Sequence, residues 1–117
     1  MSVLDPETVD QLRTLARDAD SDLLHRLQAS FARDTPPRLV ALRAALVAGN
    51  ADAVAFGLHT LSGNAANLGA SEIVATCRQI ENASETAGAP GLEQLLDQLE
   101  RNAAEAEAEL ARLAAAG

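Results

Sequence analysis

Apolar residues in the middle of the chain recur with the period of an amphipathic helix. They follow one another at steps of four, three, four and three, at Val54, Leu58, Leu61, Ala65 and Leu68. Such steps place the side chains on one stripe of a helix that faces a core. Asn50, a preferred N-cap, precedes the pattern, and Gly69, a preferred residue just beyond a helix end, follows it. The sequence therefore predicts a helix between Asn50 and Gly69.

Similar patterns before this segment predict three more helices. The first covers about residues 5–17, and the second carries the apolar residues of the range 23–31. Thr35-Pro36-Pro37 then gives a stop and restart signal, because proline interrupts a helix but is tolerated at the first position of a new one. We therefore expect a separate helix after the prolines.

Two further helices are expected after Gly69. Ser71 is the expected cap of the first, whose inward positions again step by four, three and four, at Ile73, Cys77, Ile80 and Ser84. The clearest loop of the sequence follows, at Gly88-Ala89-Pro90-Gly91. Beyond it, a heptad-like pattern of leucine and alanine continues to the end of the chain.

These segments predict an all-α fold. Helices that each carry one apolar stripe bury it against one another, and short loops make successive helices antiparallel neighbours. The expected architecture is an antiparallel four-helix bundle of up-down-up-down topology, with one or two additional N-terminal helices. Because 117 residues suit one core, we expect residues 1–117 to form a single domain.

Composition restricts the classes of function. The two aromatic residues are Phe31 and Phe56, so leucine, valine, isoleucine and alanine must form most of the core. A net charge of −8 opposes nucleic-acid binding, because the phosphate backbone is itself negative. The sequence has no run of about 18 apolar residues and no secretory signal pattern, so we expect a cytoplasmic protein that does not span a membrane.

The titratable residues offer no metal or cofactor site by their spacing. Cys77, the single cysteine, has no Cys or His at metal-ligand spacing, and we expect it to fill core space. No Gly-rich phosphate loop and no cluster of catalytic groups is present, so kinase activity of its own is not expected. The acidic residues of the last helix predict a solvated face: they are Glu100, Glu105, Glu107 and Glu109.

His59 lies just beside the apolar stripe of its predicted helix. At about 100° per residue it shares one side of the helix with small residues only, at Ala55, Ser62, Gly63 and Ala66. The imidazole should therefore stand clear of its neighbours, where a second protein can reach it. A glycine inside a helix costs about 1 kcal/mol relative to alanine. Either close helix packing, the commoner reason, or clearance beside His59 explains Gly63, and the sequence leaves both open.

These residues resemble the motif of the histidine-containing phosphotransfer (HPt) domains of multistep bacterial signalling relays. That motif has a His, a Lys three residues later, a Gly, small residues, a Leu-Gly ending, and a Cys followed by apolar and acidic residues on the next helix. The positions that fit are His59, Gly63, Asn64, Ala65, Ala66, Leu68, Gly69, Ala70, Cys77, Ile80 and Glu81. Ser62 stands where the family usually has lysine, and the chain contains no lysine at all.

The resemblance implies a phosphoryl carrier that does not catalyse its own phosphorylation. His59 would accept a phosphoryl group from the receiver domain of a hybrid histidine kinase and deliver it to the receiver domain of a response regulator. Mg²⁺ is expected on the receiver, and no cofactor is expected on this chain, which we expect to be a monomer. Gly63 would leave clearance, Ser62 would donate a hydrogen bond to a phosphate oxygen, and Glu81 would orient the imidazole.

Several alternatives stay open. The alternative function is a helical adaptor that docks receivers or other signalling proteins without being phosphorylated. Val9 and Leu12 either pack in the core or contact the receiver. Arg78 is either an ordinary surface arginine or a cation on the side of His59. His25, which has no catalytic pattern around it, fits a partly exposed structural histidine.

Overall fold

The regular secondary structure of the protein is helical wherever the structure describes it. The computed structural model describes residues 4–19, 21–84 and 91–116. Within these ranges the chain forms α1 (Pro6–Asp18), α2 (Leu23–Ala48), α3 (Ala51–Asn67), α4 (Ser71–Ser84) and α5 (Leu92–Ala116). The all-α prediction is confirmed. Residues 88–90 of the predicted loop lie outside the described residues.

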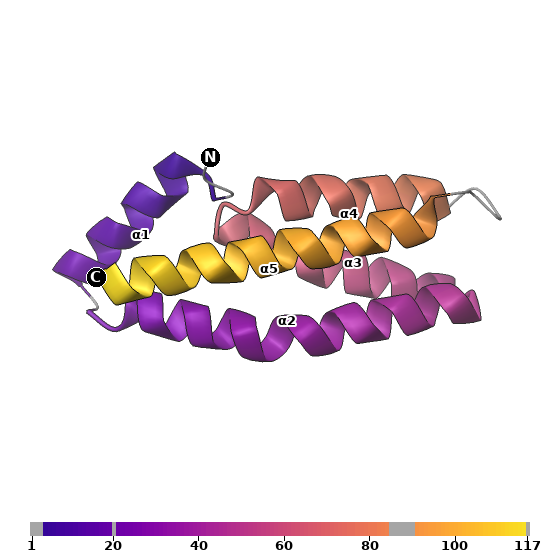
Figure 1. The fold of residues 1–117 in the computed structure, drawn as a ribbon, viewed down its shortest axis with the longest axis horizontal. Helices are drawn as coiled ribbons and strands as arrows, with labels where there is room; N and C mark the ends of the chain where they lie inside the picture. Colours follow the sequence, from indigo (N-terminus) through magenta and orange to yellow (C-terminus); the bar gives the residue numbers. More distant parts are fainter. Residues whose placement is uncertain (1–3, 20, 85–90, 117) are drawn as a thin grey trace.

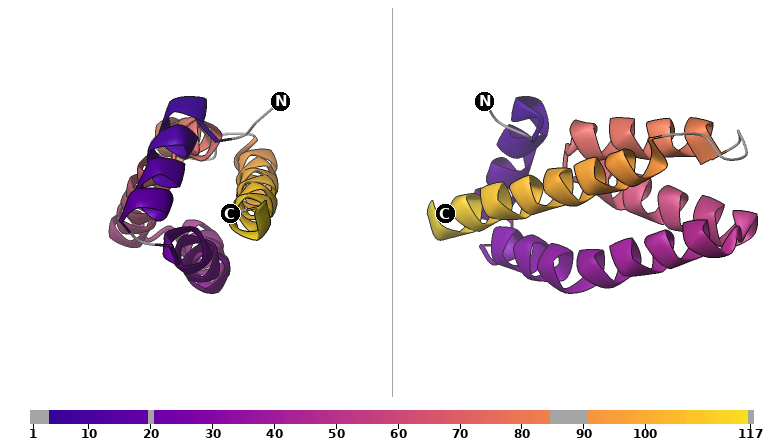
Figure 2. Two further views of the ribbon diagram at one scale, coloured as in Figure 1. Left: turned by 90° about the vertical axis from the view of Figure 1, so that its left-hand side faces the viewer. Right: turned by 45° about the vertical axis from the view of Figure 1, so that its right-hand side comes forward.

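The helices α2 to α5 lie alongside one another, and α1 lies across one end of them (Figure 1). In this view α2 and α4 run from left to right, while α3 and α5 run back. The helix α2 contacts α3 and α5, and α4 contacts the same two helices. The end view shows α1 in front of this group (Figure 2), and α1 packs against α2. Each of the four long helices therefore buries its apolar stripe against two others.

The predicted break at the prolines is wrong, because α2 is one helix of 26 residues that includes Pro36 and Pro37. Its buried residues keep a single stripe through the prolines, at Leu24, Phe31, Thr35, Leu42 and Ala45. Both prolines are exposed, so water can reach the carbonyl groups that lack a helical N–H partner. The helix bends near its middle (Figure 2), as expected for interior proline. Packing of both halves on the core thus outweighs the local stop signal.

The helix that carries His59 has the predicted bounds and caps. The Asn50 side chain accepts a hydrogen bond from the backbone N–H of Ala53 at 3.2 Å. The predicted inward residues of α3 are all buried. Ser71 is the first residue of α4 and not its cap, since the carbonyl of Ala70 accepts from the N–H groups of Ile73 and Val74.

The N-terminal end of α1 is fixed to the turn between α3 and α4. The N–H of Asp5 donates to the carbonyl of Gly69 at 2.7 Å. Gly69 has a φ of +73°, and a Cβ on it would lie 2.7 Å from the Cβ of Thr8. Both the backbone conformation and the close approach of α1 therefore require glycine at this position.

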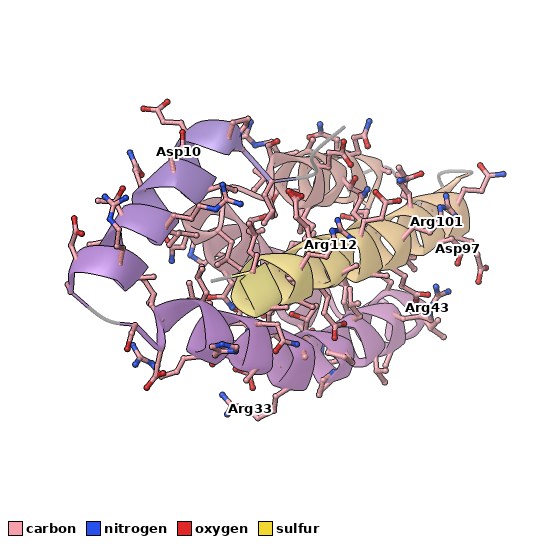
Figure 3. The ribbon with its side chains drawn as sticks, turned by 60° about the vertical axis from the view of Figure 1, so that its left-hand side comes forward. Asp10, Arg33, Arg43, Asp97, Arg101 and Arg112 are labelled. Carbon is pink, nitrogen blue, oxygen red and sulfur yellow. The ribbon has the colours of Figure 1, made fainter. Side chains whose placement is uncertain are left out.

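Polar side chains join α5 to its neighbours. The hydroxyl of Thr76 donates to the Asn102 side-chain oxygen at 2.7 Å, and both residues are buried between α4 and α5. Arg43 of α2 contacts three carboxylates of α5, including Asp97 at 3.1 Å, toward which it points (Figure 3).

One residue of the predicted solvated acidic face is buried. Glu109 is 8% exposed and accepts a hydrogen bond from the N–H of Leu4 at 3.4 Å. Glu100 and Glu105 are exposed, as predicted, and Glu107 is half-buried. The solvated-face prediction is therefore wrong for Glu109, because the chain that precedes α1 covers it.

Candidate functional site

His59 lies on the outer flank of α3, on the side of α4. Its side chain is exposed, and within the described residues it makes no hydrogen bond or ion pair. On the same helix Gly57 faces α2, since a Cβ there would lie 3.5 Å from Leu42 Cδ1. Ser62 faces α4, because its hydroxyl lies near Cys77. The imidazole is therefore held by a packed helix and open to a second molecule, as the sequence predicts.

Gly63 decides between the two explanations of the mid-helix glycine. A Cβ built on Gly63 meets nothing within 4 Å, apart from its chain neighbours and the local helix backbone. Close helix packing therefore does not require glycine here. The role of Gly63 in clearance beside His59, one turn away, stays a prediction.

Ser62 is directed into the α3–α4 interface. Its hydroxyl lies near the sulfur of Cys77, which is 1% exposed and fills core space as expected. Burial raises the pKa of the Cys77 thiol, and the Ser62 hydroxyl lowers that pKa by a smaller amount. The predicted hydrogen bond from Ser62 to a phosphate would require its hydroxyl to turn away from Cys77.

Glu81 is exposed on α4, one turn beyond Cys77. It makes no hydrogen bond with His59 in the structure, so its orienting role stays a prediction. On α1, Val9 is buried and Leu12 is half-buried, which favours core packing for both. His25 is exposed near the start of α2.

Phe56 is a surface residue that the sequence analysis did not single out. It is 74% exposed and lies one turn before His59 on α3. The spacing contained the signal, because the inward residues Val54 and Leu58 flank Phe56 and therefore point it outward. An exposed aromatic beside a reachable imidazole is typical of a docking surface.

The comparison with known families agrees with this geometry. The pattern of the Hpt domain matches residues 26–116. The chain belongs to the Hpt domain family. The match begins inside α2 and includes His59, whereas α1 and His25 lie before it. Among the two histidines of the chain, His59 is thus the one within the Hpt domain.

The fold of this Hpt protein is similar to a solved structure. It matches the crystal structure of histidine-containing phosphotransfer protein B (HptB) from Pseudomonas aeruginosa PAO1, with a TM-score of 0.80 and 24% sequence identity. The match covers 97% of this chain and 96% of that chain, so α1 belongs to the shared fold. The search of curated proteins gives no significant match.

Neither a metal cluster nor a membrane-spanning helix is found among the described residues. Among the described residues, no group of three or more His, Cys, Asp and Glu side chains is arranged to hold a metal ion. None of the helices in the described ranges has the length and apolar character needed to span a bilayer.

Proposed function

We propose that this protein carries a phosphoryl group on His59 between aspartates of two receiver domains in a phosphorelay. The observation that carries the proposal is the position of His59, an exposed imidazole without a partner on a packed helix inside the Hpt match. We infer that residues 1–117 act as a single domain. In it α2 to α5 form an antiparallel up-down-up-down bundle that presents this histidine.

The transfer needs only the lone pair of one ring nitrogen. With an unperturbed pKa of about 6.5, a histidine is mostly neutral at pH 7 and has one unprotonated nitrogen. That nitrogen attacks the phosphorus of the aspartyl phosphate, so an N–P bond forms while the O–P bond breaks. The aspartate leaves as a carboxylate, and the proton on the far ring nitrogen of His59 stays in place. The second transfer reverses these bonds on another receiver.

The receiver domain would supply most of the positive charge that neutralises the phosphoryl group during transfer. Phosphoryl transfer depends mainly on positioning and on neutralising negative charge. A receiver domain would bring Mg²⁺ with its aspartate, and this chain would need no cofactor and no kinase activity of its own. The donor would belong to a hybrid histidine kinase and the acceptor to a response regulator. The protein would meet them as a cytoplasmic monomer.

The receiver would dock on the outer flank of α3. Phe56 offers an exposed apolar contact, and Gly63 leaves room for a backbone or side chain of the partner. His59 lies between them along the helix. Docking on both sides of the ring would align the aspartyl phosphate with it.

A labelling experiment tests the proposal. Incubation with a phosphorylated receiver domain should place acid-labile, base-stable label on the wild-type chain, and His59→Gln should remain unlabelled. His25→Gln is the matched control, since His25 is also exposed, and it should be labelled like the wild type. Equal labelling of wild type and His59→Gln would refute the assignment.

The alternative is a receiver-docking adaptor that carries no phosphoryl group. It is supported by Ser62, which replaces the usual lysine of the motif and whose hydroxyl lies near Cys77. A wild-type chain that binds the phosphorylated receiver but takes up no label would favour the adaptor.

A further inference from the structure

We infer that Arg78 binds the phosphoryl group carried by His59 and supplies the positive charge that this site otherwise lacks. The inference rests on the proposed function, because it concerns the phosphorylated state of His59.

Charge favours a cation at this site, because the phosphorylated chain must hold the phosphoryl group when no receiver is bound. A phosphoryl group brings a charge of about −1.5 to −2 near pH 7, and the protein already has a net charge of −8. The chain contains no lysine, so arginine is its only permanently charged cation besides the N-terminus. The residue one turn after His59 toward α4 is Ser62, which is neutral.

Arg78 lies on the outer flank of α4, next to the side that faces α3. Thr76 marks the side that faces α5, since its hydroxyl donates to Asn102 of α5 at 2.7 Å. Cys77 lies about 100° further round the helix, toward Ser62 of α3, and Arg78 lies about 100° beyond Cys77, away from α5. On α3, His59 lies about 60° beyond Ser62, the residue whose hydroxyl lies near Cys77. Both side chains therefore leave the two helices on the same outer flank.

Arg78 and His59 also lie at nearly the same level along the two helices. The Ser62 hydroxyl lies close enough to the Cys77 thiol to lower its pKa, so these two residues mark the register of α3 against α4. His59 is three residues before Ser62, about 4.5 Å along α3, and Arg78 is one residue after Cys77, about 1.5 Å along α4. The helices run in opposite directions (Figure 1), so both displacements point the same way. The axial offset between the two residues is therefore about 3 Å.

The Arg78 side chain is available for a ligand. It is exposed and forms no ion pair within the described residues, whereas Arg43 is held by three carboxylates of α5. Arg78 lines an open groove together with Ala66, which lies on the His59 side of α3, seven residues after His59 and about 10 Å along the helix.

Acidic groups lie near this groove but do not pair with Arg78. Asp5 and Glu72 also line it. The Asp5 carboxylate accepts from the Thr8 hydroxyl at 3.1 Å, and Glu72 accepts from the Asn102 amide at 3.4 Å. Glu81, one turn after Arg78, is exposed and forms no ion pair with it. A phosphoryl group on His59 would therefore meet a guanidinium that no carboxylate holds.

The test compares two phosphoryl donors. Phosphoramidate phosphorylates an accessible imidazole without docking, so every chain in this test carries His25→Gln, which leaves His59 as the one histidine. A phosphorylated receiver domain, in contrast, requires docking. Arg78→Ala should lower both rates by roughly tenfold to a hundredfold, the range expected when a hydrogen bond to a charged group is lost. Arg78→Lys should recover most of each rate. Arg112→Ala removes an exposed arginine of α5 and should leave both rates unchanged.

A second-site change checks that the effect comes from charge. Ser62→Lys in the Arg78→Ala chain places an ammonium one turn from His59 on the side of α4, and it should restore the phosphoramidate rate. An unchanged phosphoramidate rate in Arg78→Ala would overturn the inference, even if transfer from the receiver slowed. A wild-type chain that neither donor labels would instead contradict the proposed function, so the two failures are distinguishable.

Discussion

His59 and Gly63 show how two residues one turn apart on the same helix face depend on each other. The imidazole is exposed, and the glycine beside it leaves open space where any other residue would project a side chain. Glycine lowers helix stability by about 1 kcal/mol relative to alanine. Since no packing contact requires glycine at this position, we expect its role to be access to the ring.

Gly63→Ala should therefore stabilise the fold and impair transfer. The added methyl group meets nothing in the free protein, so the free energy of unfolding should rise by about 1 kcal/mol and Tm by roughly 3–6 °C. The same methyl group lies in the docking surface and should slow transfer from a receiver by roughly tenfold. Thermal unfolding and stopped-flow transfer measure the two effects.

Gly57→Ala is the matched control for this trade-off. Its added Cβ would make an ordinary contact with Leu42 on the side of α2, away from His59. It should raise the Tm in the same way and leave the transfer rate unchanged. Equal transfer rates in Gly63→Ala and Gly57→Ala would show that clearance is not the role of Gly63.

Phe56→Ser should weaken receiver docking without unfolding the protein. An exposed side chain contributes within about 0.5 kcal/mol to stability, whereas a central aromatic contact contributes much more to binding. We expect the Kd for the receiver to rise roughly tenfold and the phosphoramidate rate to stay unchanged. Val47→Ser, an equally exposed apolar position on α2, is the control and should leave the Kd unchanged.

At the scale of the helices, local signals predicted the structure where packing agreed with them. The seam of α3 and the Asn50 cap are read directly from the spacing, and both are present. The prolines of α2 failed as a signal, because a continuous buried stripe on both sides holds the helix together. Burial of Glu109 was not predictable from α5 alone, since the residue that covers it, Leu4, is distant in the sequence.

In the candidate site, the spacing of the sequence predicts which side chains are exposed but not how their neighbours are oriented. The exposure of His59 follows from its position beside the seam, and so does that of Phe56, although a phenylalanine is usually assigned to a core. The direction of Ser62 depends on its partner Cys77, which only the packing of α3 on α4 brings near. The sequence therefore identifies the histidine but not the orientation of the groups around it.

The buried hydrogen bond between Thr76 and Asn102 joins α4 to α5, and its contribution to stability can be measured. Thr76→Val or Asn102→Leu alone leaves a buried polar partner unsatisfied and should cost about 1–3 kcal/mol in the free energy of unfolding. The double variant removes both partners and should cost less than the sum of the two. Urea unfolding measures all three, and strictly additive losses would contradict a coupled pair.

At the scale of the whole molecule, the two long sides of the bundle differ in their electrostatics. On the side of α2 and α5, Arg43 is neutralised by Glu93, Asp97 and Glu100. On the side of α3 and α4, Arg78 has no carboxylate partner and lies on the flank of His59. The helices α3 and α4 carry one arginine, Arg78, and three carboxylates, Asp52, Glu72 and Glu81, so a phosphoryl group on His59 would find its counter-charge on these helices at Arg78 alone.

The helix α1 packs at one end of the bundle and holds the turn between α3 and α4 in place. It lies outside the residues that match the Hpt domain but is fixed to the α3–α4 turn through Asp5 and Gly69. The turn sets how α4 returns along α3, and so it sets the register that brings Arg78 to the level of His59. The site thus depends on the packing of three helices and not on α3 alone.

The most direct test of the central claim is to locate the phosphoryl group itself. The wild-type chain should be phosphorylated by a receiver domain and studied by ³¹P–¹H correlation NMR at neutral pH. We predict one phosphorus signal, coupled to the ring protons of a single histidine, which is absent in His59→Gln and retained in His25→Gln. A signal coupled to His25, or a phosphorylated His59→Gln chain, would contradict the assignment of His59 as the phosphoryl carrier.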